Sequence, residues 1–150
     1  MTDLDAAVDA LGLNRFVPGL AQTELRHLVD DHRGIPDRSV IWIEFEDGDD
    51  PARLDEATGF QLESGIVAAL DQRLPVVLVI STSGTDIEQG MSALSGWGRV
   101  ASRLTACSGV VPTIVIVDGP AVSGPALLLG LADFTIMTER SSAFVNGPVM

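Results

Sequence analysis

Two runs of consecutive apolar, β-branched residues dominate the hydropathy pattern of the chain. PVVLVIS at 75–81 and PTIVIVD at 112–118 are typical of strands that are buried on both faces of a sheet. A helical pattern from about Ile87 to Cys107 lies between them, which predicts a βαβ unit with parallel strands and a right-handed crossover. The pattern repeats with the turn GPAVSG, the apolar helix PALLLGLA and the strand DFTIMT at 133–138. The sequence therefore predicts an α/β fold with a mostly parallel, buried sheet.

The segment before the first of these runs predicts one more strand and one more helix. SVIWIEFE, from Ser39, has the composition of a strand, and the acidic run that follows it at 46–51 is typical of a solvated turn. Residues 52–72 predict a helix in which Gly59 and Gly65 permit close packing on the sheet.

The two ends of the chain differ from this regular pattern. Residues 1–38 are polar and charge-rich, with leucines spaced for short amphipathic helices, so we expect a helical amino-terminal appendage there. Residues 39–150 form the predicted α/β domain. Because the chain stops at Met150 without a closing helix or strand, we expect this domain to be truncated or split and its sheet to be incomplete.

Composition and charge narrow the possible partners. A net charge of −12 over 150 residues opposes binding to the phosphates of nucleic acid or to an anionic membrane surface. The chain has no Lys, which excludes a Schiff-base lysine, and its one cysteine, Cys107, cannot form an internal disulfide. The amino terminus lacks the basic start of a signal peptide and no apolar run spans a membrane, so we expect a soluble, cytoplasmic protein.

Candidate chemistry lies in two turns that follow the buried strands. Each turn contains a Ser-Gly pair and precedes a predicted helix: Ser83 and Gly84 in the first turn, Ser123 and Gly124 in the second. Backbone N–H groups at such places can stabilise a carbonyl oxygen that gains negative charge. Helix capping and tight turns explain the same pairs without any catalysis, and the spacing alone does not decide between these alternatives.

Other mechanisms find less support among the residues. A serine hydrolase needs a histidine base, but His27 and His32 both lie in the predicted appendage. Carboxylates at strand ends and helix starts suit a capping role better than acid–base catalysis; these are Asp86, Glu88, Asp118 and Asp133. We predict no metal site.

Beyond these physical patterns, three consecutive segments resemble the biotin-dependent carboxyltransferase domain. They are TSGTDIEQGMSALSGWGRV, ASRLTACSGVVPTIVIVDGPAVSG and LADFTIMTERSSAFVNGP, and the resemblance covers about residues 55–150. It implies a ClpP/crotonase-like spiral of ββα units and transfer of a carboxyl group between carboxybiotin, held on a separate carrier, and an acyl-CoA. It also implies a partner, either a carboxy-terminal carboxyltransferase half or another copy in a homo-oligomer.

The resemblance assigns roles to residues of both turns. The backbone amides of Ser83, Gly84, Ser123 and Gly124 match paired glycines of the family and become oxyanion donors, with serine in place of the first glycine each time. Substrate-binding positions implied by the same match are Thr82, Thr85, Gly119, Pro120 and Pro125.

This sequence departs from the family pattern in one charge, because the arginine that follows the first turn in the family is Asp86 here. Arg99, Arg103 or Arg140 would then have to compensate for that charge near the phosphates of CoA. Three alternatives therefore stay open: a crotonase-type hydratase, isomerase or decarboxylase, a malonate-decarboxylase-like subunit that acts on an acyl carrier protein, and a non-catalytic partner subunit.

Overall fold

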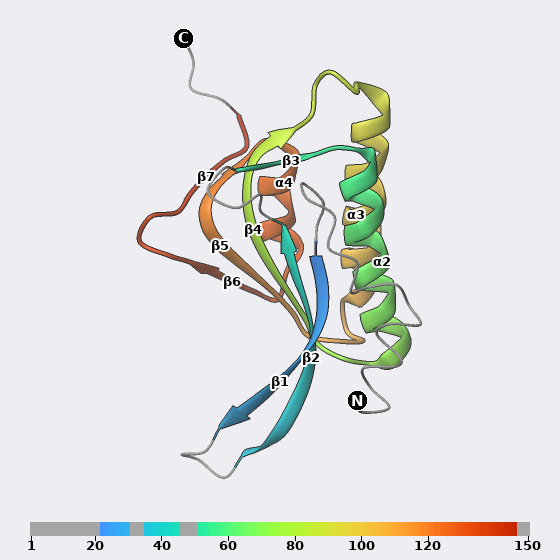
Figure 1. Ribbon diagram of the computed structural model, residues 1–150, viewed down its shortest axis with the longest axis vertical. Coiled ribbons are helices and arrows are strands. Elements are labelled where there is room, and N and C mark those ends of the chain that lie inside the picture. Colours follow the sequence, from blue (N-terminus) through green and yellow to red (C-terminus); the bar gives the residue numbers. More distant parts are fainter. Residues whose placement is uncertain (1–21, 31–34, 46–50, 147–150) are drawn as a thin grey trace.

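The computed structural model describes residues 22–30, 35–45 and 51–146, which form one sheet with a layer of helices (Figure 1). The sheet has seven strands in the order β1-β2-β4-β5-β6, with β3 added beside β4 and β7 beside β5. All pairings are parallel except that of β1 with β2. The strands are β1 (Gln22–Asp30), β2 (Ile35–Phe45), β3 (Ala52–Leu54), β4 (Val76–Thr85), β5 (Thr113–Val122), β6 (Phe134–Met137) and β7 (Ser142–Phe144).

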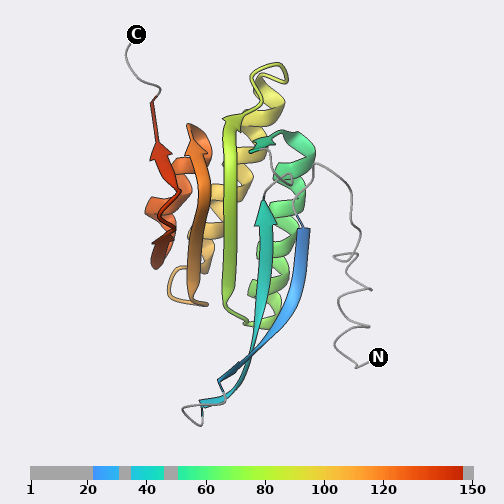
Figure 2. The same cartoon turned by 60° about the vertical axis from the view of Figure 1, so that its left-hand side comes forward.

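The helices lie together on one side of the sheet, as the turned view shows (Figure 2). They are α2 (Glu56–Gln72), α3 (Met91–Cys107), the single turn α4 (Gly124–Leu127) and the 3₁₀ segment η1 (Leu128–Leu131). The first five residues of β4, Val76 to Ile80, are all buried, which confirms the prediction of a central strand. Alternate residues of β2, β4 and β5, such as Ile43, Leu78 and Val115, belong to the core cluster together with Leu62 and Val100 from the helices.

The predicted helix over 52–72 begins four residues later than expected, at Glu56. Asp55 follows the short strand β3 and caps α2, since its Oδ1 accepts the Thr58 N–H at 2.7 Å. Gly59 does permit close packing, but against Gly96 of α3 rather than the sheet. Gly65 lies against Thr23 and Ile43 of the sheet, as expected.

The helical appendage predicted over 1–38 is wrong wherever the structure describes it. Residues 22–30 form β1 and residues 35–38 begin β2, and the two strands pair antiparallel with Leu25 opposite Ile41. Leucine spacing in so short a segment fits a helix or a strand, and pairing along β2 decides in favour of the strand. Pro36 is tolerated because β2 pairs only with β1 there and meets β4 from Ile41 onward. Residues 1–21 lie outside the described part.

The two predicted turns are more extended than the sequence suggests. β4 continues through Thr82, Ser83 and Gly84 to Thr85, and α3 begins only at Met91 instead of Ile87. β5 likewise continues to Val122, so that Ser123 directly precedes the single turn of α4. The first Ser-Gly pair is therefore the end of a strand and not the start of a helix.

Candidate functional site

The carboxyl ends of β4 and β5 lie side by side and border a cleft of about 360 Å³. Thr82 of β4 is opposite Ala121 of β5, so the two Ser-Gly pairs that follow are neighbours. In parallel sheets, ligands bind beyond the carboxyl ends of the strands, which makes this the candidate site. The cleft is lined by residues from both turns, from α3 and α4, and from the segment after β7: Thr85, Leu94, Trp97, Ser123, Gly124, Leu127, Val145 and Asn146.

The first turn places glycine in a conformation that other residues avoid. Gly84 has φ 113° and is buried, whereas Ser83 is exposed and has no positive φ. The Gly84 N–H donates to the Thr82 hydroxyl at 3.0 Å. That amide therefore already has an acceptor within the turn.

The second turn places serine in the unusual conformation instead. Ser123 has φ 63° and ψ −133°, a region that only glycine occupies at low cost, and its N–H donates to the Phe144 carbonyl of β7 at 2.7 Å. The Ser123 carbonyl accepts the Ala126 N–H at 3.1 Å. Gly124 follows as the first residue of α4, where a backbone N–H has no intrahelical acceptor, and Pro125 has no N–H at all.

The two turns are in close contact. A Cβ on Gly84 would lie 3.3 Å from the Val122 carbonyl oxygen and 3.4 Å from Ser123 Cβ, and a Cβ on Gly124 would lie 3.0 Å from Thr85 Oγ1. The structure thus brings together Gly84, Thr85, Ser123 and Gly124 of the predicted site.

Of these four, Thr85, Ser123 and Gly124 line the cleft, and the remaining predicted residues do not. Ser83 is exposed at the end of β4, and its hydroxyl oxygen lies 3.5 Å from the Ala52 carbonyl. Thr82 and Pro125 are buried, while Gly119 and Pro120 belong to β5, where Pro120 is opposite Ser142 of β7.

Five lining residues were not predicted: Leu94, Trp97, Leu127, Val145 and Asn146. Trp97 and Asn146 both occur in the segments that carry the family resemblance, so that signal could have indicated them. Leu94 also lies in one of these segments and Leu127 lies in none, but neither suggested a cleft, because an apolar residue in a helix is usually part of the core. Here they are 51% and 44% exposed, and they make the wall of the cleft apolar.

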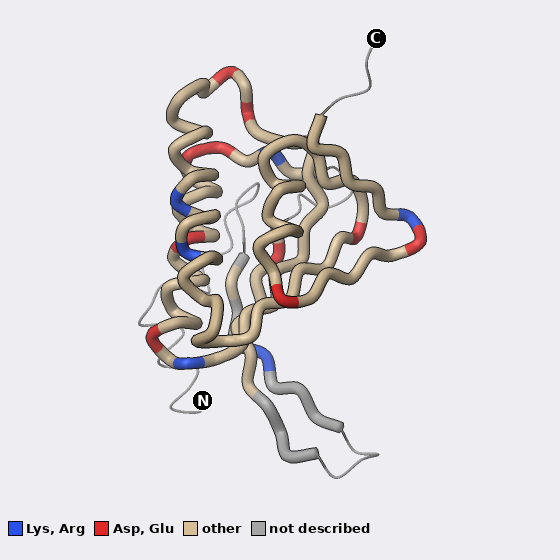
Figure 3. The backbone as a smooth tube through the Cα atoms, turned by 180° about the vertical axis from the view of Figure 1, so that it is seen from behind, with Lys and Arg blue, Asp and Glu red and all other residues tan. Residues whose placement is uncertain are grey.

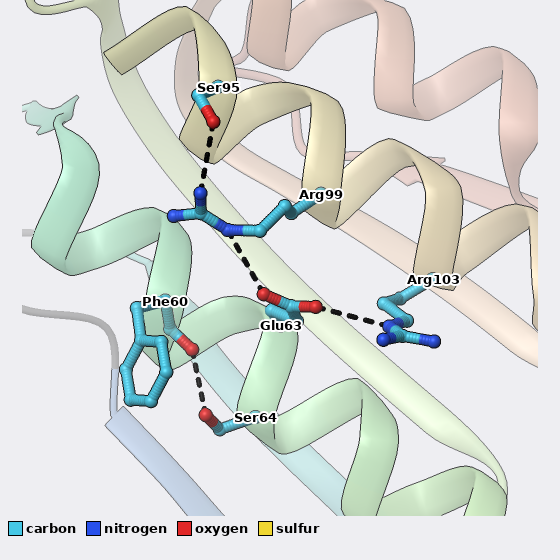
Figure 4. Close-up of polar contacts among 6 residues, drawn as sticks. All are labelled: Phe60, Glu63, Ser64, Ser95, Arg99 and Arg103. Atoms are coloured by element: carbon cyan, nitrogen blue, oxygen red, sulfur yellow. Dashed lines mark hydrogen bonds and ion pairs between the residues drawn. The ribbon is translucent and has the colours of Figure 1, made fainter. Parts of the chain in front are cut away.

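The arginines expected to compensate for Asp86 are all paired with carboxylates. Arg99 and Arg103 of α3 both contact Glu63 of α2, each at 3.1 Å (Figure 4). Arg140 donates to both carboxylate oxygens of Asp118, at 2.8 and 2.7 Å. These hydrogen bonds, and a further one from Thr138, hold the pKa of Asp118 below its usual value.

One exposed arginine lies beside the first turn without such a partner. Arg53 of β3 is opposite Gly84 in the parallel register, and among the described residues it forms no ion pair. The few basic positions are scattered over the backbone (Figure 3). Arg53 is therefore a local source of positive charge at this end of the sheet.

The other candidate carboxylates make structural hydrogen bonds, and the cysteine is a core residue. Asp133 accepts the Thr113 N–H at 2.8 Å at the opposite end of β5, and Asp86 accepts the Glu88 N–H at 3.0 Å. Cys107 is buried in the core, and this burial raises the pKa of its thiol. His27 belongs to β1, which β2 and β4 separate from β5, and His32 lies outside the described residues.

Within the described ranges, no three His, Cys, Asp or Glu side chains are grouped so that they could hold a metal ion. No helix among those residues is long and apolar enough to cross a membrane.

Comparison with known protein families identifies the family of this chain. Residues 51–150 match the model of the carboxyl transferase domain. The chain belongs to the carboxyl transferase domain family. The match includes β4, α3, β5 and both Ser-Gly turns, which confirms the resemblance inferred from the sequence.

Curated relatives of this carboxyl transferase chain are much longer than the matched segment. The methylmalonyl-CoA carboxyltransferase 12S subunit of Propionibacterium freudenreichii subsp. shermanii is 34% identical over 87 residues, 55% of this chain and 17% of the relative. The propionyl-CoA carboxylase carboxyltransferase subunit of Haloferax mediterranei is 36% identical over 81 residues, 53% of this chain and 16% of the relative. This chain thus spans about a sixth of these relatives.

Solved structures confirm the α/β fold with a mostly parallel sheet. A transcarboxylase 12S structure, described as a hexamer with methylmalonyl-coenzyme A bound, matches with TM-score 0.75 and 25% identity over 90% of this chain and 25% of its own. A Pseudomonas malonate decarboxylase hetero-dimer matches with TM-score 0.69 over 83% of this chain and 60% of its own. At 16% identity, the second match is evidence for the fold alone.

Proposed function

We propose that this chain is a carboxyltransferase component that moves a carboxyl group between carboxybiotin on a separate carrier and an acyl-CoA. The observation that carries the proposal is the contact between the two Ser-Gly turns at one cleft, within a chain of the carboxyl transferase family. The thioester would enter this cleft, with its carbonyl oxygen toward the second turn.

Of the four backbone amides assigned to oxyanion binding, the Gly124 amide is the best candidate. Those of Gly84 and Ser123 donate to acceptors within the protein, whereas Gly124 lines the cleft as the first residue of α4. An amide aimed at the oxygen of a developing enolate lowers the barrier by roughly 3 kcal/mol. The apolar wall of Leu94, Trp97 and Leu127 would strengthen that interaction because it excludes water.

The residues that line the cleft suit the acyl group and biotin but not the phosphates of CoA. Among the residues that the structure describes, the cleft lining contains hydroxyl, amide and apolar groups and no charged side chain. Thr85 is the residue of the first turn that reaches the cleft and would hold the biotin side, and carboxybiotin supplies the carboxyl group. The phosphates must therefore be bound outside the cleft, and Arg53 is the candidate.

A test of Arg53 can use Arg73 as a matched control. Neither forms an ion pair with a carboxylate among the described residues, but Arg73 ends α2 at the opposite end of β4. We expect Arg53→Gln to weaken binding of propionyl-CoA about tenfold and to leave binding of propionyl-N-acetylcysteamine, which has no phosphate, unchanged. Arg73→Gln should change neither. Equal losses from both variants would reject a local role for Arg53.

The reaction class is tested by decarboxylation of malonyl-CoA and methylmalonyl-CoA with and without free biotin. The chain is measured alone and together with a carboxy-terminal carboxyltransferase half. Biotin-dependent turnover in the mixture supports the proposal. Biotin-independent turnover would instead support a crotonase-type enzyme, and turnover with malonyl-acyl carrier protein but not with CoA esters would support a malonate-decarboxylase-like subunit.

One observation favours a second candidate, a partner subunit without catalysis. The strained Ser123 has its N–H engaged by Phe144, so the second turn offers one open amide where the family resemblance implies a pair. A complex that assembles but shows no turnover with any of these substrates would support this candidate.

A further inference from the structure

A side-chain hydrogen bond joins the two halves of the cleft. The Trp97 Nε1–H donates to the Gly124 carbonyl at 2.7 Å, and the bond is partly buried. Trp97 lies in α3, which follows the first turn, whereas Gly124 opens α4 after the second turn. The bond therefore connects two segments that are 27 residues apart in sequence and that border the same cleft.

Gly124 is held from two sides. A Cβ at this position would lie 3.1 Å from Trp97 Cδ1 and 3.0 Å from Thr85 Oγ1. The indole ring thus packs against the backbone of Gly124 on one side, and the first turn contacts it on the other. No side chain larger than hydrogen fits there without displacing one of these neighbours.

Within the second turn, the peptide that carries the Gly124 N–H is held by the bond from the Ala126 N–H to the Ser123 carbonyl. Pro125 has no N–H, and the Leu128 N–H is directed at the carbonyls of Pro125 and Ala126. Ser123 has a positive φ, which is costly to maintain unless the surroundings impose it. A donor from α3, a helix of 17 residues whose Ala93, Gly96 and Val100 are buried, is a rigid support for such a turn.

We propose that Trp97 is a positioning residue, whose indole N–H fixes the Gly124 carbonyl and, through the Gly124 backbone, keeps the amide of the preceding peptide directed at the cleft. This inference rests on the proposed function for its catalytic meaning, but its structural part can be tested without any substrate. Trp97 transfers no proton and forms no bond with the substrate in this role. It acts through Gly124.

The first experiment measures hydrogen exchange of the free protein by NMR. Trp97→Phe keeps an aromatic ring in place and removes the donor. Because the Ala126 N–H donates to the Ser123 carbonyl within the same turn, loss of the indole bond should speed exchange of the Ala126 amide about tenfold. Trp42→Phe assigns the two indole signals, since the Trp42 Nε1–H also donates, to Glu44 Oε1 at 2.7 Å. Unchanged exchange at Ala126 in Trp97→Phe would overturn the proposal, whether or not the protein is active.

The second experiment separates positioning from simple contact with the substrate. In the complex that shows turnover, Trp97→Phe should lower kcat about tenfold with little change in KM, because it disturbs an interaction made mainly in the transition state. Leu94→Ala is the control, since it removes another part of the wall and leaves the Trp97–Gly124 hydrogen bond in place, and it should raise KM while leaving Ala126 exchange as in the wild type. A rise in KM alone for Trp97→Phe would show that the indole ring only lines the cleft and does not position Gly124. Absence of turnover in the wild type would reject the proposed function and leave the exchange result to decide the role of Trp97.

Discussion

The two Ser-Gly turns have the same dipeptide but use it in opposite ways. In the first, the positive φ of 113° falls on Gly84, and the preceding serine has no positive φ. In the second, the positive φ of 63° falls on Ser123, and the glycine after it follows an ordinary helical start. The same dipeptide sequence therefore forms a relaxed turn in one place and a strained turn in the other.

The partners of the turns explain how this difference persists. Gly84 is bonded locally, through the Thr82 hydroxyl. Ser123 is held by groups from elsewhere in the chain, because its N–H meets Phe144 of β7 and its neighbour Gly124 meets Trp97 of α3. A strained residue is maintained when its surroundings over-determine it, and such strain is often found at functional sites.

The largest effect that the comparison predicts is at the first turn. Gly84→Ala should lower the free energy of unfolding by about 2–3 kcal/mol, because alanine is strained at φ 113° and its Cβ meets Val122 and Ser123. Urea denaturation measures this loss. Gly124→Ala is the matched change in the second turn and should cost about 1 kcal/mol, because φ is permitted and only Trp97 and Thr85 must move. Equal losses would show that the difference in backbone conformation between the turns does not affect the free energy of unfolding.

Replacing each serine by glycine should give effects of opposite sign. Ser123→Gly should raise the free energy of unfolding by about 1 kcal/mol, because it removes the strain at φ 63°. Ser83→Gly should lower it by about 0.5 kcal/mol, because an ordinary extended residue becomes more flexible in the unfolded chain. Denaturation midpoints of the two variants, compared at equal m-values, check both signs. The contrast between the turns is refuted if both substitutions destabilise.

The sequence predicted the sheet better than it predicted the backbone of the site. Apolar runs such as Val76 to Ile80 indicate a central strand by composition alone, and the structure confirms it. Leu25 and its neighbours gave a wrong prediction of helix, because spacing in a short segment cannot report the pairing with β2. Which residue of a Ser-Gly pair takes a positive φ depends on Phe144 and Trp97, and both contacts are long-range.

The smallest predicted effect concerns the ion pair that flanks the second turn. Asp118 precedes Gly119 in β5, and Arg140 ties it to the segment between β6 and β7. Arg140→Gln should raise the pKa of Asp118 toward its ordinary value, and Thr138→Val should raise it less, because the hydrogen bonds from Arg140 are the larger cause of the lowered pKa. Carboxyl carbon NMR titration measures both changes.

The same pKa shift makes stability depend on pH. Since the pKa of Asp118 is lower in the folded protein, its stabilising contribution is present above the pKa of the unfolded chain and is lost as the pH falls through the pKa of the folded protein. The stability difference between wild type and Arg140→Gln should therefore be present at neutral pH and diminish in acid, and a difference that persisted below the folded pKa would mean that Arg140 acts through contacts other than Asp118.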